Sequence, residues 1–180
     1  TKMERYVALL RGINISGKNK IAMSELKKGL EKLGFTQVVT HLNSGNAAFS
    51  TDGEESGLSD KISAMIKSEF GLEIPVFVIL QSELMDILDN APEWWGDDGK
   101  EIYDNIIFAM PPLKTEEIFT ELGELNAEYE KAEGYKNAVF WSFSRADYRK
   151  TNWWAKTANS PISGKITIRT ANTIRKTAVI

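Results

Sequence analysis

Apolar residues in the first half of the chain follow two patterns, short unbroken runs and a repeat of about four positions. The runs are typical of buried strands, and the repeat is typical of one face of a helix. The patterns predict a strand, a helix, two strands, a helix and a strand, over residues 5–10, 23–33, 36–42, 46–50, 58–70 and 76–80. Gly34 and Gly71 suit the ends of the two helices, because glycine readily adopts the left-handed conformation found there. Residues 43–45 would form the turn of a hairpin, and the order is that of a ferredoxin-like unit.

The same order returns in the second half of the chain. Ser82 precedes a short helix at residues 83–89, and the stretch PEWWGDDGK at 92–100 has the composition of a linker. A strand, a helix, two strands, a helix and a strand are then predicted over residues 104–110, 115–122, 128–133, 138–144, 152–157 and 165–169, with a terminal helix at 172–179. We therefore predict an α+β fold of two ferredoxin-like halves with antiparallel sheets, plus connecting and C-terminal helices. The halves would be residues 1–91 and 104–180, joined by a linker at 92–103.

Composition narrows the function classes. Among the 180 residues there is no Cys, which excludes disulfides, a thiol nucleophile and a thiolate metal site. No apolar run approaches the roughly 18 residues that a membrane span needs. The first residues, TKMERY, lack the apolar stretch of a secretory signal, so we expect a cytoplasmic protein without a membrane partner.

Charge is distributed unevenly along the chain. The net charge is −3, yet seven basic residues and no acidic one follow Asp147. Ten carboxylates and a single Lys lie between Glu69 and Asp104, whereas residues 5–24 and 32–51 contain no acid. This partition predicts an electropositive surface built from the N-terminal loops and the C-terminal tail. The alternative is that the acidic and basic faces pair within the protein.

The segment LRGINISGKNK, after the first strand, matches the opening of a phosphate-binding P-loop at Gly12, Gly17 and Lys18. Asn19 stands where that motif needs Ser or Thr, and the predicted helix begins only at Met23. No later strand ends in Asp, and the predicted antiparallel sheet differs from the parallel sheet of P-loop proteins. We therefore reject a P-loop.

The segment nevertheless carries many hydrogen-bond donors on a flexible backbone. Arg and Lys beside a group of backbone amides suit a carboxylate or phosphate ligand. The candidate ligand-binding residues here are Arg11, Asn14, Lys18 and Asn19. The alternative is structural, with the glycines shaping a turn and Asn14 capping it.

The stretch YVALLRGINISGKNKIAMSELKKGLEKLGFTQVVTHLNSGNAAF closely resembles the start of the domain of unknown function 1697 family of small bacterial proteins. The stretch ITIRTANTIRKTA is similar to that family's Thr-x-Arg-Asn-x-x-Thr segment, with Thr170-Ala171 inserted before Asn172. A second departure is His41, where the family more often has Tyr. The resemblance implies two ferredoxin-like halves whose signature loops meet between them, at residues 11–20, 44–46 and 167–173. It adds Ser44, Asn46, Arg169 and Thr173 to the candidate ligand-binding residues. The order of the elements alone does not decide whether the loops at residues 11–20 and 44–46 lie at the same end of their sheet or at opposite ends.

Poised catalytic groups are scarce, and we predict neither catalytic residues nor a metal site. His41 is the only His, and we interpret it as structural or exposed. The acidic pairs Asp97-Asp98 and Glu54-Glu55 lie in Gly-rich loops where solvation is the default. In the pairs Trp94-Trp95 and Trp153-Trp154, one ring should pack and the other should be partly exposed.

The sequence thus favours a protein that binds an anionic small molecule, a nucleotide or a phosphorylated metabolite, in a cleft between its halves. One alternative is an enzyme of phosphoryl or nucleotide chemistry that uses Arg and Lys rather than His or Cys. Another is a nucleic-acid-binding module, which the net acidity disfavours. The sequence indicates no particular cofactor or oligomeric state.

Overall fold

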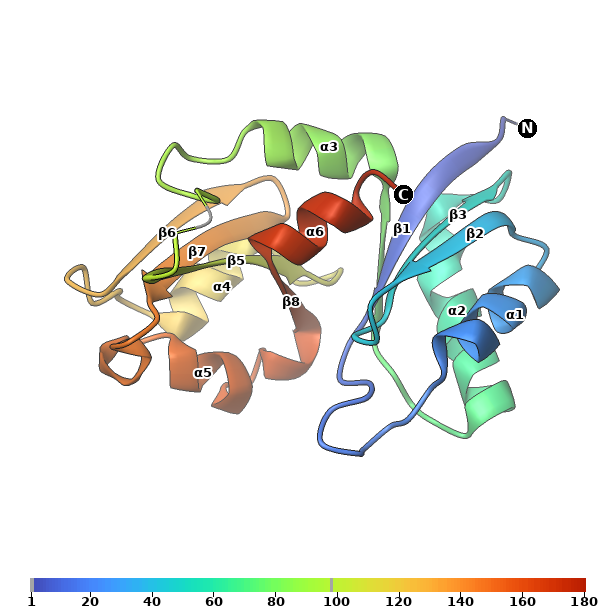
Figure 1. Ribbon diagram of the computed structural model, residues 1–180, viewed down its shortest axis with the longest axis horizontal. Coiled ribbons are helices and arrows are strands. Elements are labelled where there is room, and N and C mark those ends of the chain that lie inside the picture. The colour runs from blue at the N-terminus through green and yellow to red at the C-terminus, as the bar shows by residue number, and fades with distance from the viewer. Residues whose placement is uncertain (1, 98) are drawn as a thin grey trace. The chain divides into compact units, whose positions relative to one another are not determined.

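A computed structural model of the chain describes residues 2–97 and 99–180, and these residues form two compact units (Figure 1). Unit 1 comprises residues 1–86 and 176–180, and unit 2 comprises residues 87–175. The chain passes from one unit to the other inside two helices, α3 (Gln81–Asp89) and α6 (Ala171–Thr177). The predicted division at residues 1–91, 92–103 and 104–180 remains a prediction.

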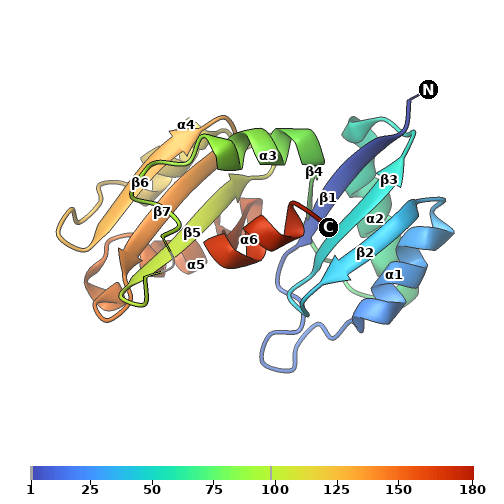
Figure 2. The ribbon, with the colours of Figure 1, turned by 45° about the horizontal axis from the view of Figure 1, so that its top comes forward.

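Unit 1 is a four-stranded antiparallel sheet with two helices on one face (Figure 2). Its elements are β1 (Glu4–Leu10), α1 (Met23–Lys32), β2 (Thr36–His41), β3 (Asn46–Thr51), α2 (Glu55–Phe70) and β4 (Val76–Leu80). The strand order is β2-β3-β1-β4, so the first strand lies inside the sheet. This order confirms the predicted ferredoxin-like topology of the first half.

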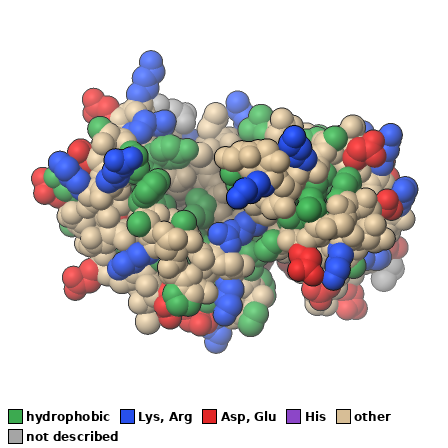
Figure 3. Space-filling view, turned by 90° about the horizontal axis from the view of Figure 1, so that it is seen from below, with side chains coloured by type: hydrophobic (Ala, Val, Ile, Leu, Met, Phe, Trp, Pro, Cys, Tyr) green, Lys and Arg blue, Asp and Glu red, His purple; other side chains and the backbone are tan. Residues whose placement is uncertain are grey.

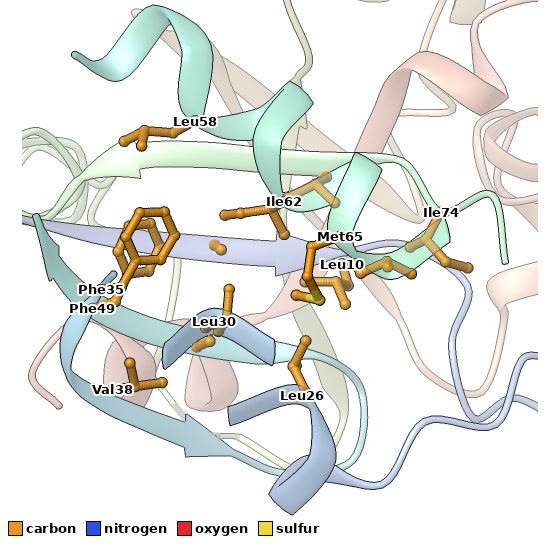
Figure 4. Packing of buried hydrophobic residues seen from close by; sticks show 14 of the residues in the cluster. Leu10, Leu26, Leu30, Phe35, Val38, Phe49, Leu58, Ile62, Met65 and Ile74 are labelled. Atoms are coloured by element: carbon orange, nitrogen blue, oxygen red, sulfur yellow. The ribbon is translucent and has the colours of Figure 1, made fainter. Parts of the chain in front are cut away.

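The apolar residues that recur about every four positions in α1 and α2 form the core of unit 1. Leu26 and Leu30 of α1 and Ile62 of α2 are fully buried against the sheet (Figure 4). Phe35 and Phe49 belong to the same core cluster and stack on each other, with ring centroids 4.3 Å apart. Because each such side chain contributes about 1.5–3 kcal/mol when it is buried, this face holds the sheet and helices together.

Unit 2 repeats the arrangement with a second antiparallel sheet, in the order β6-β7-β5-β8. Its elements are β5 (Ile102–Ala109), α4 (Thr115–Leu122), β6 (Glu130–Tyr135), β7 (Ala138–Ser144), α5 (Trp154–Asn159) and β8 (Ile166–Thr170), with short 3-10 turns at Tyr148–Lys150 and Ser163–Lys165. Ile118 and Leu122 of α4 pack with Trp141 and Trp153 in one core cluster. The second half is therefore also ferredoxin-like, as predicted.

The first strand of the hairpin in unit 2 differs in its bounds from the predicted residues 128–133. Strand β6 begins at Glu130 rather than at residue 128, and Tyr135 pairs directly with Ala138 across a two-residue turn. The reason is the Glu130 carboxylate, which is only 3% exposed and accepts hydrogen bonds from the backbone amides of Asn126 and Asn152. These bonds hold the residues before β6 in a turn.

The Trp residues largely follow the expected division between packed and exposed rings. Trp153 is fully buried and Trp154 is 45% exposed. Trp95, within the predicted linker, is buried in unit 2, where it donates to the Asn105 carbonyl at 2.7 Å and meets Phe140 edge to face. Asp98 of the acidic pair lies outside the described residues. No helix of residues 2–97 and 99–180 is long and apolar enough to cross a membrane.

Candidate functional site

Three segments of unit 1 meet at one end of its sheet. The Leu10 amide donates to the Gly45 carbonyl at 2.8 Å, and the Arg11 amide donates to the Pro75 carbonyl at 3.0 Å. The cause is topological, because β1 runs antiparallel to both β3 and β4, so the end of β1 lies beside their beginnings. The loop at residues 11–22 and the hairpin at residues 42–45 are therefore neighbours, and the alternative that they lie at opposite ends is wrong.

The loop at residues 11–22 has an unusual backbone. Five of its residues have positive φ, which only glycine adopts without cost: Gly12, Asn14, Ser16, Gly17 and Asn19. At its tip the Lys18 amide donates to the Ile15 carbonyl at 2.9 Å. Ser16 and Gly17 between them both have positive φ, as in a type I′ turn. Such conformations persist only when other contacts hold them.

Asparagine side chains supply those contacts. Asn14 donates from Nδ2 to the carbonyls of Ile21 (2.9 Å) and Asn43 (2.7 Å), and its Oδ1 accepts from the Ile21 amide at 2.9 Å. Asn19 donates to the Gly12 carbonyl at 2.9 Å. These side-chain amides thus hold the loop to itself and to the neighbouring hairpin, a structural role that the sequence suggested for Asn14. Direct contact of Asn14 or Asn19 with a ligand remains a prediction.

Asn46 and Ser44 hold the hairpin in shape in the way that Asn14 and Asn19 hold the loop. Asn46 is completely buried and donates from Nδ2 to the His41 carbonyl and to the Ser44 hydroxyl, both at 2.9 Å. These bonds set the shape of the turn between β2 and β3. Direct contact of Ser44 or Asn46 with a ligand also remains a prediction.

The basic side chains of the loop are placed differently from the asparagines. Arg11 is half-buried, and its guanidinium makes no hydrogen bond or ion pair with any residue of 2–97 and 99–180. Burial lowers the pKa of Arg11 from its ordinary value, because the charged form loses water. Lys18 and Lys20 are exposed, and neither forms an ion pair within the described part of the chain. In the view from below, on the side of the molecule where this loop lies in Figure 1, Lys and Arg side chains reach the surface (Figure 3).

A hollow of about 410 Å³ borders the loop. It is lined by Asn14, Gly17, Lys20, Ile21, Ala22 and Asn43. Lys20 and Asn43 are absent from the candidate residues chosen from the sequence. Lys20 could have been found, because it lies in the same acid-free loop, but Asn43 is recognisable only once the hairpin is known to meet the loop.

The remaining two candidates, Arg169 and Thr173, lie in unit 2. Arg169 is 8% exposed and donates from Nη1 to the Thr167 hydroxyl at 3.1 Å and to the Ile168 carbonyl at 3.0 Å. Burial lowers the pKa of Arg169 to about 10. Thr173 donates its amide to the Thr170 hydroxyl at the start of α6. The expectation that these residues share a ligand with the loop at residues 11–22 remains a prediction.

Few side chains of the described residues are suited to catalysis. The Nε2 atom of His41 is buried and has no hydrogen-bond partner among the described residues. No cluster of three His, Asp or Glu side chains suited to a metal occurs within residues 2–97 and 99–180. The antiparallel sheet around β1 and the start of α1 at Met23 confirm that the G-x-x-x-x-G-K match is not a P-loop.

Comparisons with known proteins agree with this description. A family model described as "Protein of unknown function (DUF1697)" matches residues 3–140. Among solved structures, the conserved bacterial protein SP0830 from Streptococcus pneumoniae is similar, with a TM-score of 0.86, 29% sequence identity and 98% of each chain covered. A comparison with curated proteins gave no match.

Proposed function

The chain belongs to the domain of unknown function 1697 family, and we propose that its loop at residues 11–22 binds an anionic small molecule, a nucleotide or a phosphorylated metabolite. The observation that carries the proposal is the Arg11 guanidinium, which is half-buried without a partner in the described part of the chain. A cation that has lost part of its water and gained no counter-charge is costly. A phosphate or carboxylate would supply the missing charge-assisted hydrogen bonds.

Three further properties of the loop favour phosphate. Lys18 and Lys20 add positive charge without a neighbouring acid, since residues 5–24 contain none. Consecutive positive φ values at Ser16 and Gly17 are the kind of irregular backbone in which amides can converge on an anion. The hollow of about 410 Å³ lies within the range of small-ligand pockets, roughly 300–1,000 Å³.

One observation supports a nucleic-acid-binding module as a second candidate. The exposed Trp154 meets Tyr148 edge to face at 4.6 Å, and the Arg149 guanidinium lies 5.4 Å from the Tyr148 ring centre. Aromatic and basic side chains in this arrangement can stack on bases. The net charge of −3 and the position of these residues outside the Arg11 loop make this the weaker candidate.

Titration calorimetry with ATP, AMP, a hexose phosphate, pyrophosphate and a short oligothymidylate would test the proposal. We expect a small phosphate compound to bind, and Arg11→Gln to weaken binding about tenfold or more, because a charge-assisted hydrogen bond contributes roughly 1.5–3 kcal/mol. Lys20→Gln should weaken it by a smaller factor. Lys27→Gln, on the exposed face of α1, is the control and should leave the affinity unchanged.

Two outcomes would contradict the proposal. One is the absence of binding by any small phosphate compound at about 1 mM, the weak end of specific affinity. The other is an unchanged affinity in Arg11→Gln. Salt-sensitive binding of the oligonucleotide alone would favour the nucleic-acid module, and release of phosphate from a bound nucleotide would favour the alternative of an enzyme.

A further inference from the structure

Three strand ends of unit 2 meet at one end of its sheet. Strand β5 begins there, β7 ends there with Ser144 opposite Ile102, and β8 ends there with Thr170 opposite Asn105. A hollow of about 460 Å³ lies at this end. Tyr103, Asp104 and Arg145 are among the residues that line it.

Arg145 presents a fixed positive charge to this hollow. Its guanidinium lies 4.4 Å from the centre of the Tyr103 ring, and that ring stacks in turn on Phe143 with centroids 5.4 Å apart. The Arg145 amide donates to the Glu101 carbonyl at 2.9 Å, which anchors the backbone. The guanidinium makes no hydrogen bond or ion pair within residues 2–97 and 99–180, so its N–H groups are free to bind an anion.

Asp104 presents a negative charge from the sheet itself. Its side chain is on β5, directly after Tyr103, and the residue is only 8% exposed. One carboxylate oxygen, Oδ1, accepts the hydroxyl of Ser142 from the paired strand β7. The other, Oδ2, receives no hydrogen bond from any described residue. Oδ2 is therefore available to accept a hydrogen bond from a cationic donor in the hollow.

The two charges border the same hollow but form no ion pair with each other in the described part of the chain. A ligand that carries both charges would satisfy both side chains. We propose that this hollow binds a small zwitterion of the amino-acid type, with its carboxylate on Arg145 and its ammonium group on Asp104. A sugar phosphate fits less well, because Arg145 would bind its phosphate but the ligand would bring no cation to the Asp104 carboxylate.

A thermal-shift screen of the twenty free amino acids, with inorganic phosphate and a hexose phosphate beside them, tests the proposal. We expect at least one amino acid to raise the melting temperature, because a ligand that binds only the native state stabilises it. Calorimetry should then show that Asp104→Asn weakens binding about tenfold or more, because the ammonium group of the ligand loses its charged partner. The Asn side chain keeps an acceptor for Ser142, so this variant should fold.

Matched controls are present in the same unit. Arg149 also lies over a tyrosine ring, and Asp147 also accepts a serine hydroxyl, from Ser144 at 3.2 Å, but neither borders the hollow. Arg149→Gln and Asp147→Asn should therefore leave amino-acid binding unchanged. Arg145→Gln, at an exposed position, should abolish it and serves as a second test if Asp104→Asn is poorly folded.

Three results would overturn the inference. They are the absence of a shift with every amino acid, wild-type affinity in both Asp104→Asn and Arg145→Gln, and equal binding of the same compound without its amino group. Arg11→Gln should leave this binding intact, so the result is independent of the proposed anion site in unit 1.

Discussion

At the scale of single residues, the loop at residues 11–22 shows that backbone conformation alone can explain which residue types a loop contains. Asn14, Ser16 and Asn19 have φ values of 54°, 51° and 50°. Among residues other than glycine, Asn is the one that most readily occupies this region, because its short amide bonds to nearby backbone groups. A loop rich in Asn and Gly is therefore what this conformation requires, and the basic residues are the ones left for a ligand.

Gly45 is the residue on which the meeting of loop and hairpin most depends. Its φ is +90°, and an added Cβ would lie 2.8 Å from Leu10 Cβ and 2.9 Å from Ile13 Cδ1. We expect Gly45→Ala to lower the free energy of unfolding by about 2–4 kcal/mol, because backbone strain adds to overpacking. Urea unfolding followed by far-UV circular dichroism measures this.

Gly12→Ala is the matched control for Gly45→Ala. Gly12 also has positive φ, +71°, but an added Cβ would meet nothing within 4 Å. We expect a loss of only about 1 kcal/mol, from the backbone strain alone. Equal losses in the two variants would show that the close approach of Gly45 to Leu10 and Ile13 does not matter.

At the scale of elements, most strands and helices could be predicted because apolar periodicity reports directly on burial. The core-facing residues of α1 and α2 were recognisable in this way. The start of β6 was not, because it depends on the Glu130 carboxylate binding the amides of Asn126 and Asn152, a contact without any local pattern. Sequence reasoning fails where the contacts of one buried carboxylate, made here with residues 4 and 22 positions away, decide where a strand begins.

The candidate sites divide in the same way. Arg11 and its loop could be predicted, since the donors are consecutive in the sequence. Arg145 and Asp104 were missed because Asp104 lies on β5 and Arg145 directly follows β7, so they come near the same hollow only in the folded sheet. The one available hint was a carboxylate placed at the start of the apolar run of β5.

Asn14 makes the loop at residues 11–22 a defined element, and its replacement should show this. Asn14→Asp keeps the shape and the tolerance for positive φ but removes both donors to Ile21 and Asn43. We expect a loss of about 2 kcal/mol in the free energy of unfolding, because two carbonyls lose their partners and face a carboxylate. Asn19→Asp removes one donor, to Gly12, and should cost about half as much. A larger loss in Asn19→Asp, measured by urea unfolding, would contradict this ranking.

At the scale of the whole molecule, unit 1 is built from two separate segments of the chain. Residues 176–180 return to it, where Arg5 donates from Nε and Nη2 to the Ile180 carbonyl at 3.2 and 2.9 Å, and Gln81 donates to the Ala178 carbonyl at 2.8 Å. The stability of unit 1 therefore depends on residues that follow the whole of unit 2 in the sequence. Such contacts between distant parts of the sequence leave no trace in local patterns.

Arg5 lets this dependence be measured. Besides Ile180, its guanidinium donates to the Gln37 carbonyl and the Ser50 hydroxyl, so Arg5→Met removes all of these bonds at once. We expect unit 1 to lose about 2–4 kcal/mol, because hydrogen bonds to a charged group contribute more than neutral ones. Lys2→Met, at an exposed position, is the control and should have no measurable effect.

The two units can be followed separately, because all five Trp residues lie within residues 87–175. Fluorescence thus reports on unit 2, and far-UV circular dichroism reports on both. Release of the tail should fray α6, whose Arg175 donates to the Gly96 carbonyl and lies 5.2 Å from the Trp95 ring centre in unit 2. We therefore expect Arg5→Met to lower the urea midpoint by roughly 1 M in both signals together. A fluorescence transition that stays in place while the dichroism becomes biphasic would mean that the helices α3 and α6 do not couple the units, and that each unit unfolds by itself.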